Sequence, residues 1–154
     1  FDISVEEFKT VLDTNLTGGF LVSRAAAKHM IRLGIKGSII NMASMSGFVV
    51  NVPQKQAVYN ASKAAVSQMT KSLAIEWAGY GIRVNALDPG YLENLYDIEE
   101  IPEENLRIWS QRIPLEGRFC KFSELVPALL YLACDAAGYT TGSDVIVDGG
   151  YTAV

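Results

Sequence analysis

One short apolar segment constrains the fold more than any other part of the chain. Residues 37–43, Gly-Ser-Ile-Ile-Asn-Met-Ala, form a nearly continuous apolar run. Such a run is typical of a strand that is buried on both faces of a parallel sheet. A second strand is expected over residues 82–87, and a shorter third one over residues 145–147. Parallel strands need long crossover connections, so the segments between them are expected to be helices.

A long helix is predicted before the first strand. Apolar residues recur at helical spacing from about residue 5 to residue 33, and Ser4 and Glu7 fit a capping box at the start of this segment. Gly18 and Gly19 lie inside it, where glycine is unfavourable unless another group packs closely. An irregularity is therefore expected near these two glycines.

Further helices are predicted after each of the first two strands. An alanine-rich helix is expected from about residue 57 to residue 78, and Ser123 is expected to cap a helix that ends near Cys134. Residues 91–118 resemble an insertion, with a short helix over about 102–112. A lid over a substrate and a solvated excursion explain this acidic segment equally well.

The alternation of helix and strand determines the fold class. It predicts an α/β fold, a partial doubly wound parallel sheet of the Rossmann-like kind, with covering helices and right-handed crossovers. Ligands of such sheets bind outside the carboxyl ends of the strands. In this chain Ser44 follows the first strand, and Pro89 and Gly90 follow the second.

Composition and charge argue against several classes of function. The formal net charge is -4 and the basic residues are scattered, so no nucleic-acid groove is expected. No apolar run is long enough to span a membrane. Cys120 and Cys134 lack paired metal-ligand spacing and His29 is the only histidine, so no metal site is expected. Reduced cysteines are typical of a cytoplasmic protein.

Tyr59 and Lys63 form the first candidate for chemistry. They are four residues apart in a predicted helix, and residues at this spacing share one face. An ammonium favours the ionised form of a nearby phenol, whose unperturbed pKa is about 10, so the pair could carry a proton near neutral pH. The spacing alone is weak evidence, because roughly 0.3 such pairs are expected by chance, and an ordinary surface pair is the alternative.

Five motifs together resemble the C-terminal half of the short-chain dehydrogenase/reductase family. They are Asp-Thr-Asn-Leu-Thr-Gly at 13–18, Ile-Ile-Asn-Met-Ala-Ser at 39–44, Tyr-Asn-Ala-Ser-Lys at 59–63, Arg-Val-Asn-Ala-Leu-Asp-Pro-Gly at 83–90, and Thr-Gly at 141–142 with Asp-Gly-Gly at 148–150. Each is weak alone, but their order and approximate spacing are those of the family. The resemblance implies that residues 1–154 are the C-terminal part of one Rossmann-like dehydrogenase domain and contain its last three strands.

The resemblance implies a catalytic tetrad for the interconversion of a secondary alcohol and a ketone. Tyr59 would be the general acid/base and Lys63 its activator. Ser44 would bind the substrate oxygen, and Asn15 would hold a water that relays protons to Lys63. Ser46 competes with Ser44, because it lies at the commonest family separation from the tyrosine. Ser44 is preferred because it directly follows the strand and begins the family's pattern of a serine, two residues and a glycine.

The same resemblance implies a nicotinamide cofactor. The residues implied to contact it are Tyr59, Lys63, Pro89, Gly90, Leu92 and Asn94. Asn94 stands where the family often has a threonine, which puts the local geometry in doubt. The chain has no Gly-rich turn for a pyrophosphate, so the N-terminal cofactor-binding half is expected to be absent. The implied cofactor is NAD or NADP, with NADP slightly preferred.

The loop at 51–56 and the tail at 151–154 resemble members that reduce ketoses or oxidise sugar alcohols, of the sorbose, mannitol and arabinitol types. The residues expected to contact such a small-molecule substrate are Ser44, Gln54 and Tyr91.

Two hypotheses follow. The chain is the catalytic half of an oxidoreductase that forms a homodimer or homotetramer through the helices at 5–33 and 57–78. Alternatively, it is a truncated member without turnover, which associates through those helices.

Overall fold

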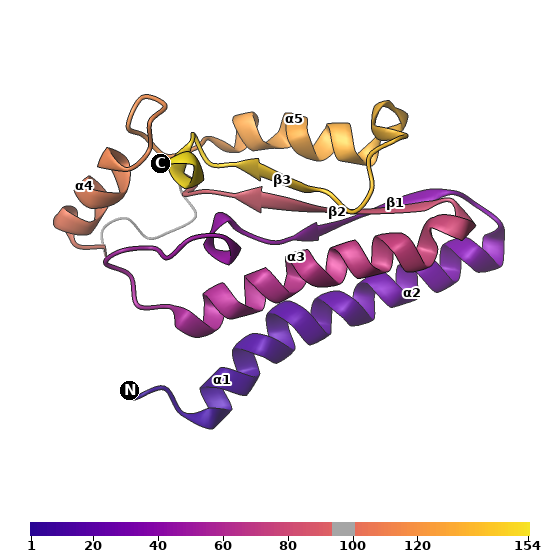
Figure 1. Ribbon diagram of the computed structural model, residues 1–154, viewed down its shortest axis with the longest axis horizontal. Helices are drawn as coiled ribbons and strands as arrows, with labels where there is room; N and C mark the ends of the chain where they lie inside the picture. The colour runs from indigo at the N-terminus through magenta and orange to yellow at the C-terminus, as the bar shows by residue number, and fades with distance from the viewer. Residues whose placement is uncertain (94–100) are drawn as a thin grey trace.

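The computed structural model describes residues 1–93 and 101–154 and confirms the predicted α/β fold (Figure 1). Three parallel strands, β1 (Gly37–Met42), β2 (Ile82–Pro89) and β3 (Asp144–Val147), form one sheet in the order β1-β2-β3. All three strands point toward the end of the molecule where both termini lie. Ser44 and Gly90 therefore lie beyond the same edge of the sheet.

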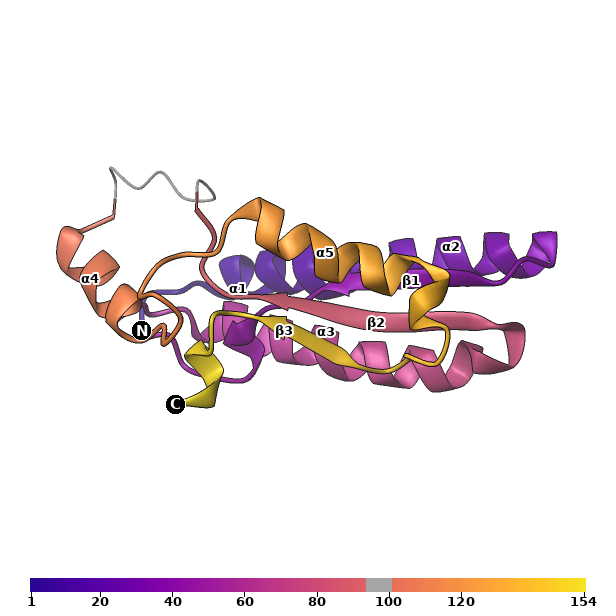
Figure 2. The same cartoon turned by 90° about the horizontal axis from the view of Figure 1, so that it is seen from above.

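Helices cover both faces of this sheet. The helices α2 (Gly18–Leu33) and α3 (Ala57–Trp77) pack on one face, where Ile39 and Val84 belong to their apolar core. The helix α5 (Phe122–Ala133) packs on the opposite face, and Leu87 and Ile40 lie in its core. Figure 2 shows the sheet between α3 and α5. Neighbouring strand residues such as Ile39 and Ile40 face opposite ways, as alternation along a strand requires.

The first helical segment is not the single helix that the apolar spacing predicts. It consists of α1 (Val5–Leu12), the π-helical turn η1 (Asp13–Thr17) and α2. The wide turn closes when the Gly18 N–H donates to the Asp13 carbonyl. A Cβ at Gly18 would lie 3.3 Å from that carbonyl oxygen, which explains the irregularity expected near the glycines.

The capping predictions had different outcomes. At α1, Ser4 Oγ accepts from the Glu7 N–H at 3.1 Å and Glu7 Oε2 accepts from the Ser4 N–H at 2.7 Å, which confirms the capping box. The prediction that Ser123 caps α5 is wrong. The helix begins one residue before Ser123, with Lys121 at the N-cap, because Glu124 Oε2 accepts from the Lys121 N–H at 2.9 Å.

The remaining elements are short. The helix α4 (Glu103–Gln111) lies within the predicted range of 102–112. The turns η2, η3, η5 and η6 are single 3-10 turns at Met45–Gly47, Ala78–Tyr80, Asp135–Ala137 and Tyr151–Ala153. Within residues 1–93 and 101–154, β1 pairs with β2 alone.

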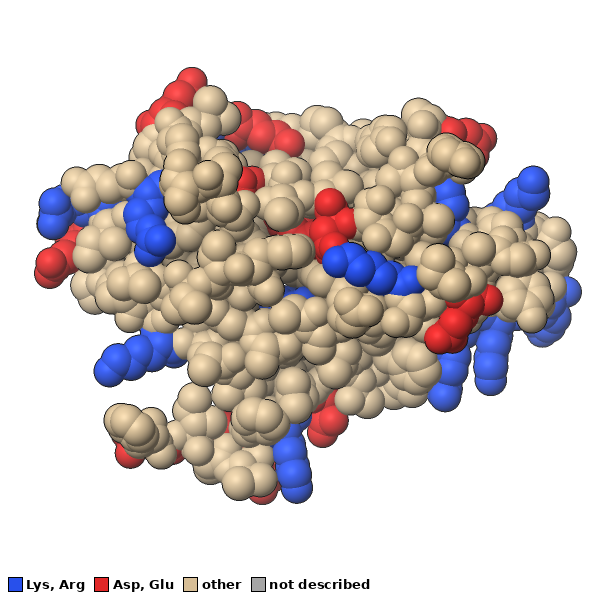
Figure 3. Space-filling view, in the orientation of Figure 1, with Lys and Arg blue, Asp and Glu red and all other residues tan. Residues whose placement is uncertain are grey.

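The surface carries interspersed charges. On the face shown in Figure 3, basic and acidic side chains lie among a larger area of uncharged residues. In the described part of the chain, no helix has both the length and the hydropathy to cross a membrane. No group of three or more metal-ligating side chains occurs among those residues.

Candidate active site

A polar cavity of about 370 Å³ opens at the carboxyl end of the sheet. It brings together residues from the segment after β1, from α3 and from the segment after β2. Five residues assigned from the sequence line it, namely Ser44, Gln54, Tyr59, Gly90 and Tyr91. Its other lining residues are Met45, Ser46, Asn51 and Gln56. This size is within the range of small-molecule sites.

Ser44 has a fixed position at the end of β1. Its N–H donates to Asp88 Oδ1 at 3.2 Å, and its Oγ accepts from the Ser46 N–H at 3.2 Å as the N-cap of η2. The hydroxyl proton of Ser44 has no acceptor among the described residues. It can therefore donate to an oxygen atom of a ligand in the cavity.

Ser46 lines the same cavity, but its hydroxyl has a side-chain partner instead of a backbone one. Its Oγ accepts from Gln56 Nε2 at 3.2 Å. The turn η2 that carries Ser46 lies close to α3, since a Cβ at Gly47 would be 2.9 Å from the backbone nitrogen of Ala64 and 3.0 Å from the carbonyl carbon of Lys63. Only a glycine allows this approach, which sets the two serines beside the helix of Tyr59.

Tyr59 and Lys63 share one face of α3, as their spacing predicts. The Lys63 Nζ lies 5.6 Å from the centroid of the Tyr59 ring and donates to the Met42 carbonyl at 2.9 Å. The side chain of Tyr59 is about one-third exposed, at 36%, and lines the cavity. Burial lowers the pKa of Lys63, and the nearby Asp88 carboxylate opposes this shift.

Asn15 reaches this helix from η1. Its Nδ2 donates to Ser62 Oγ at 2.9 Å, and Ser62 Oγ donates to the Tyr59 carbonyl at 2.7 Å. Asn15 thus contacts α3 between Tyr59 and Lys63. No hydrogen bond joins Asn15 directly to Lys63 in the ranges that the structure describes. Ser62, which is fully buried, is missed by sequence reasoning.

A wall of amides and hydroxyls forms another side of the cavity. Asn51 is 1% exposed, donates to the Tyr91 hydroxyl at 3.1 Å and accepts from Gln56 Nε2 at 2.8 Å. The Tyr91 hydroxyl donates to Gln54 Oε1 at 3.4 Å. Gln54 and Tyr91 are predicted substrate contacts, whereas Asn51 and Gln56 are missed. The spacing of amides in the 51–56 loop is the signal that could have indicated them.

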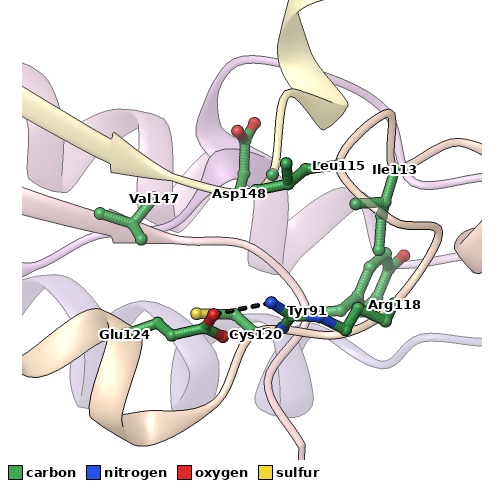
Figure 4. Close-up of a pocket in the computed structure, with 9 residues that line it drawn as sticks. Tyr91, Ile113, Leu115, Arg118, Cys120, Glu124, Val147 and Asp148 are labelled. Carbon is green, nitrogen blue, oxygen red and sulfur yellow. Dashed lines mark hydrogen bonds and ion pairs between the residues drawn. The ribbon is translucent and has the colours of Figure 1, made fainter.

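A second cavity of about 100 Å³ also has Tyr91 in its lining (Figure 4). Arg118 lines this cavity, and its guanidinium donates hydrogen bonds to Glu124 at 2.7 and 2.8 Å and to Glu116 at 2.6 Å. The Arg118 guanidinium lowers the pKa of Glu124 to about 2. Asp148 also lines this cavity, and its carboxylate accepts from the N–H groups of Gly150 at 2.9 Å and Thr152 at 2.8 Å.

The residues expected to contact the cofactor do not all lie at the cavity. Pro89 ends β2, and Gly90 lies so close to β3 that a Cβ there would be 2.8 Å from the Cα of Asp148. Leu92 is 5% exposed, lies in the core under α5 and does not line the cavity. Asn94 lies outside the described residues. Contacts of these residues with a cofactor remain predictions.

Known proteins resemble nearly all of this chain. A family model described as enoyl-(acyl carrier protein) reductase matches residues 1–152. An L-xylulose reductase of Hypocrea jecorina is 45% identical over 98% of this chain and 56% of its own length. A probable NADP-dependent mannitol dehydrogenase of Yarrowia lipolytica is 46% identical over 95% of this chain and 51% of its own. The chain thus spans about half the length of these relatives.

A solved structure shows the same arrangement of elements. A short-chain type dehydrogenase/reductase from Mycobacterium marinum superposes with a TM-score of 0.93 and 45% identity, over 99% of this chain and 59% of that one. A gluconate 5-dehydrogenase from Burkholderia cenocepacia, in complex with NADP and tartrate, superposes with a TM-score of 0.91 and 34% identity, over 99% of this chain and 59% of that one. From the family model, the sequence identity and the fold, the chain belongs to the short-chain dehydrogenase/reductase family.

Proposed function

We propose that the protein containing this chain is an NAD(P)-dependent oxidoreductase that interconverts a sugar alcohol and a ketose. The observation that carries the proposal is the meeting of Ser44 and Tyr59 at one polar cavity, with Lys63 beside the tyrosine ring. The names of relatives, which include L-xylulose reductase and NADP-dependent mannitol dehydrogenase, support the substrate class.

The cavity offers the groups that a secondary alcohol or ketone needs. In reduction, Tyr59 gives its hydroxyl proton to the carbonyl oxygen, and in oxidation it takes the proton of the alcohol. Ser44 donates a hydrogen bond to the same oxygen and stabilises the charge that develops there. Lys63 places its ammonium 5.6 Å from the centre of the Tyr59 ring. Asn15 holds η1 against α3 through Ser62, and a water beside it is the proposed link to Lys63.

The residues present fit the nicotinamide end of an NAD(P) cofactor. Lys63 Nζ has three N–H donors, and one of them is used by the Met42 carbonyl, so two can bind the hydroxyls of a ribose. The Tyr59 hydroxyl is a further donor. When bound, the cofactor supplies or accepts the hydride. The preference for NADP over NAD stays a prediction, and relatives with both dependences are known.

The polar wall supports a polyhydroxylated substrate. Gln54, Tyr91 and Ser46 present amide and hydroxyl groups to the cavity, and such groups are costly to bury unless a ligand or neighbour satisfies them. Each can donate or accept, which matches the hydroxyls of a sugar alcohol. An apolar substrate would form no hydrogen bond with these groups, whereas a sugar alcohol can add hydrogen bonds to those that they already form with one another.

The test is a panel of polyols and ketoses, assayed in the natural full-length protein with NADH and NADPH. Turnover of at least one C5 or C6 polyol–ketose pair, with simple aliphatic alcohols far slower, is the expected result. Turnover confined to apolar ketones would contradict the substrate class. Absence of turnover with every pair and both nucleotides would contradict the reaction.

A second function, self-association without turnover, has one supporting observation. Apolar side chains on the long helices are exposed, including Phe8 at 43%, Val22 at 71% and Ile75 at 79%. The same surface is our proposed dimer or tetramer contact in the active enzyme. Intact mass of the native protein separates the two functions: a species of only 154 residues favours the association module, and a longer one favours the enzyme. A cytoplasmic location stays a prediction.

A further inference from the structure

The segment that ends at Ser44 is held by three contacts. The Met42 carbonyl accepts from Lys63 Nζ at 2.9 Å, the Ala43 N–H donates to the Leu87 carbonyl at 2.9 Å, and the Ser44 N–H donates to Asp88 Oδ1 at 3.2 Å. Two of these contacts come from charged side chains of opposite sign. Lys63 on α3 and Asp88 on β2 therefore both form hydrogen bonds with the backbone of residues 42–44.

Asp88 is an unusual residue for its position. It is 0% exposed at the end of β2 and forms no ion pair within the described ranges; the polar groups beside its carboxylate are the Ser44 N–H and the Ser67 hydroxyl. Burying a carboxylate is costly unless it is paired. A serine or alanine would be easier to accommodate on stability grounds alone, so the carboxyl invites a functional explanation.

Two lysines and a second aspartate surround Asp88. Lys63 and Lys71 approach from α3, and Asp144 on β3 pairs with Lys71 at 2.7 Å. Burial first and Asp144 second raise the pKa of Asp88 to about 6, while the Ser44 N–H, Ser67 and Lys71 act in the opposite direction. The carboxyl is thus ionised above that pH and neutral below it.

We propose that Asp88 is a positioning residue of the active site, which fixes the Ser44 backbone and places a negative charge near Lys63, whose ammonium binds the same short segment. This inference rests on the proposed function of Ser44 and Lys63. Asp88 does not touch the substrate. It acts through Ser44, because its bond to the Ser44 N–H orients the residue whose hydroxyl donates into the cavity. It also acts through Lys63, because its negative charge stabilises the charged ammonium.

Two substitutions in the natural full-length protein separate the two roles. Asp88→Ala removes both the acceptor and the charge, so kcat is expected to fall about tenfold to a hundredfold, because a positioning error at a reacting group has effects of this size. Asp88→Asn keeps an oxygen that can accept from the Ser44 N–H. Its kcat is therefore expected to fall less than that of the alanine variant.

The charge role is tested on Lys63 itself. In protein labelled with carbon-13 lysine, the signal that disappears in Lys63→Arg identifies the residue, and its shift is followed with pH. Asp88→Asn is expected to lower the pKa of Lys63, whereas Asp135→Asn, an equal charge change on the exposed η5 turn, is expected to leave it unaltered. This titration requires no turnover.

Each outcome supports or overturns the inference. Equal kcat in Asp88→Ala and the wild type would overturn the anchoring role, and an unchanged pKa of Lys63 in Asp88→Asn would overturn the charge role. If Asp88→Ala does not fold, Asp88→Asn and the lysine titration still decide. If the wild type turns over no polyol, the proposed function fails, while the titration still reports on the Lys63–Asp88 pair.

Discussion

The side-chain amide of Asn15 donates a 2.9 Å hydrogen bond to the hydroxyl of Ser62, forty-seven residues along the chain. The contact ties the π-helical turn η1 to the second turn of α3. Since Ser62 lies between Tyr59 and Lys63, the turn supports the helix at the point where it carries the candidate catalytic pair. π-Helical turns are often found at functional sites, and this one has a defined structural partner.

Asn15→Ala is expected to destabilise the protein by about 1–3 kcal/mol, because it leaves the buried Ser62 hydroxyl without its donor. Denaturant unfolding measures the change. Thr14→Ala, an exposed neighbour on the same turn, is the matched control and should differ little from the wild type. Equal unfolding free energies in the two variants would show that the contact contributes nothing.

Gly47→Ala is expected to shift η2 away from α3, because the new Cβ would lie 2.9 Å from the Ala64 nitrogen. Overpacking of this kind costs about 1–3 kcal/mol. Turnover should fall as well, since η2 carries Ser46 and is capped by Ser44. Gly79→Ala is the control, because its Cβ meets no atom within 4 Å. A Gly47 variant as stable and active as this control would contradict the close approach.

Ser44→Ala and Ser46→Ala decide between the two serines. Both hydroxyls accept one hydrogen bond and have a proton to donate, but only the backbone N–H of Ser44 is bound by Asp88 within the described residues, which fixes its position. Loss of the Ser44 hydroxyl is therefore expected to reduce kcat by about a hundredfold to a thousandfold, as for other oxyanion donors. Ser46→Ala mainly removes the acceptor of Gln56 and should affect kcat less. Steady-state kinetics of both variants give the answer. A larger loss of kcat in the Ser46 variant would reverse the assignment.

The raised pKa of Asp88 predicts that the stability of the protein depends on pH. Its pKa is raised from 3.8 to about 6 in the folded protein, so the folded state binds the proton more tightly than the unfolded chain. That stabilisation is complete below pH 4 and is lost as the pH rises through 6, by about 3 kcal/mol at most. Asp88→Asn should therefore gain stability relative to the wild type between pH 4 and 7. A difference in unfolding free energy that does not vary with pH would contradict this.

Local patterns predicted most of the fold. The apolar run of β1 and the long helix α3 depend on neighbours in the sequence, and both lie close to their expected ranges. The capping of α5 was wrong because Glu124 binds the backbone of Lys121, which starts the helix before Ser123. The family resemblance supplied the order of the motifs, and that order placed Ser44 and Tyr59 at one site.

Long-range contacts explain what the sequence left out. Asn51 binds Tyr91, forty residues away, and Asp88 binds Ser44, forty-four residues away. Each side chain is polar and buried, and nothing in its own neighbourhood identifies its partner. The irregularity near Gly18 and Gly19 is predicted, but the contact of η1 with α3, from Asn15 to Ser62, is again a long-range one. These contacts follow from the packing of the crossovers, which periodicity alone does not specify.

The central claim is that Tyr59 carries the proton in a polyol–ketose oxidoreductase. Its most direct test is the turnover of Tyr59→Phe in the natural full-length protein, with nucleotide binding measured on the same sample. The account predicts nearly abolished kcat and almost unaltered nucleotide affinity, because the substitution removes the hydroxyl and keeps the ring beside Lys63. Turnover close to that of the wild type would contradict it.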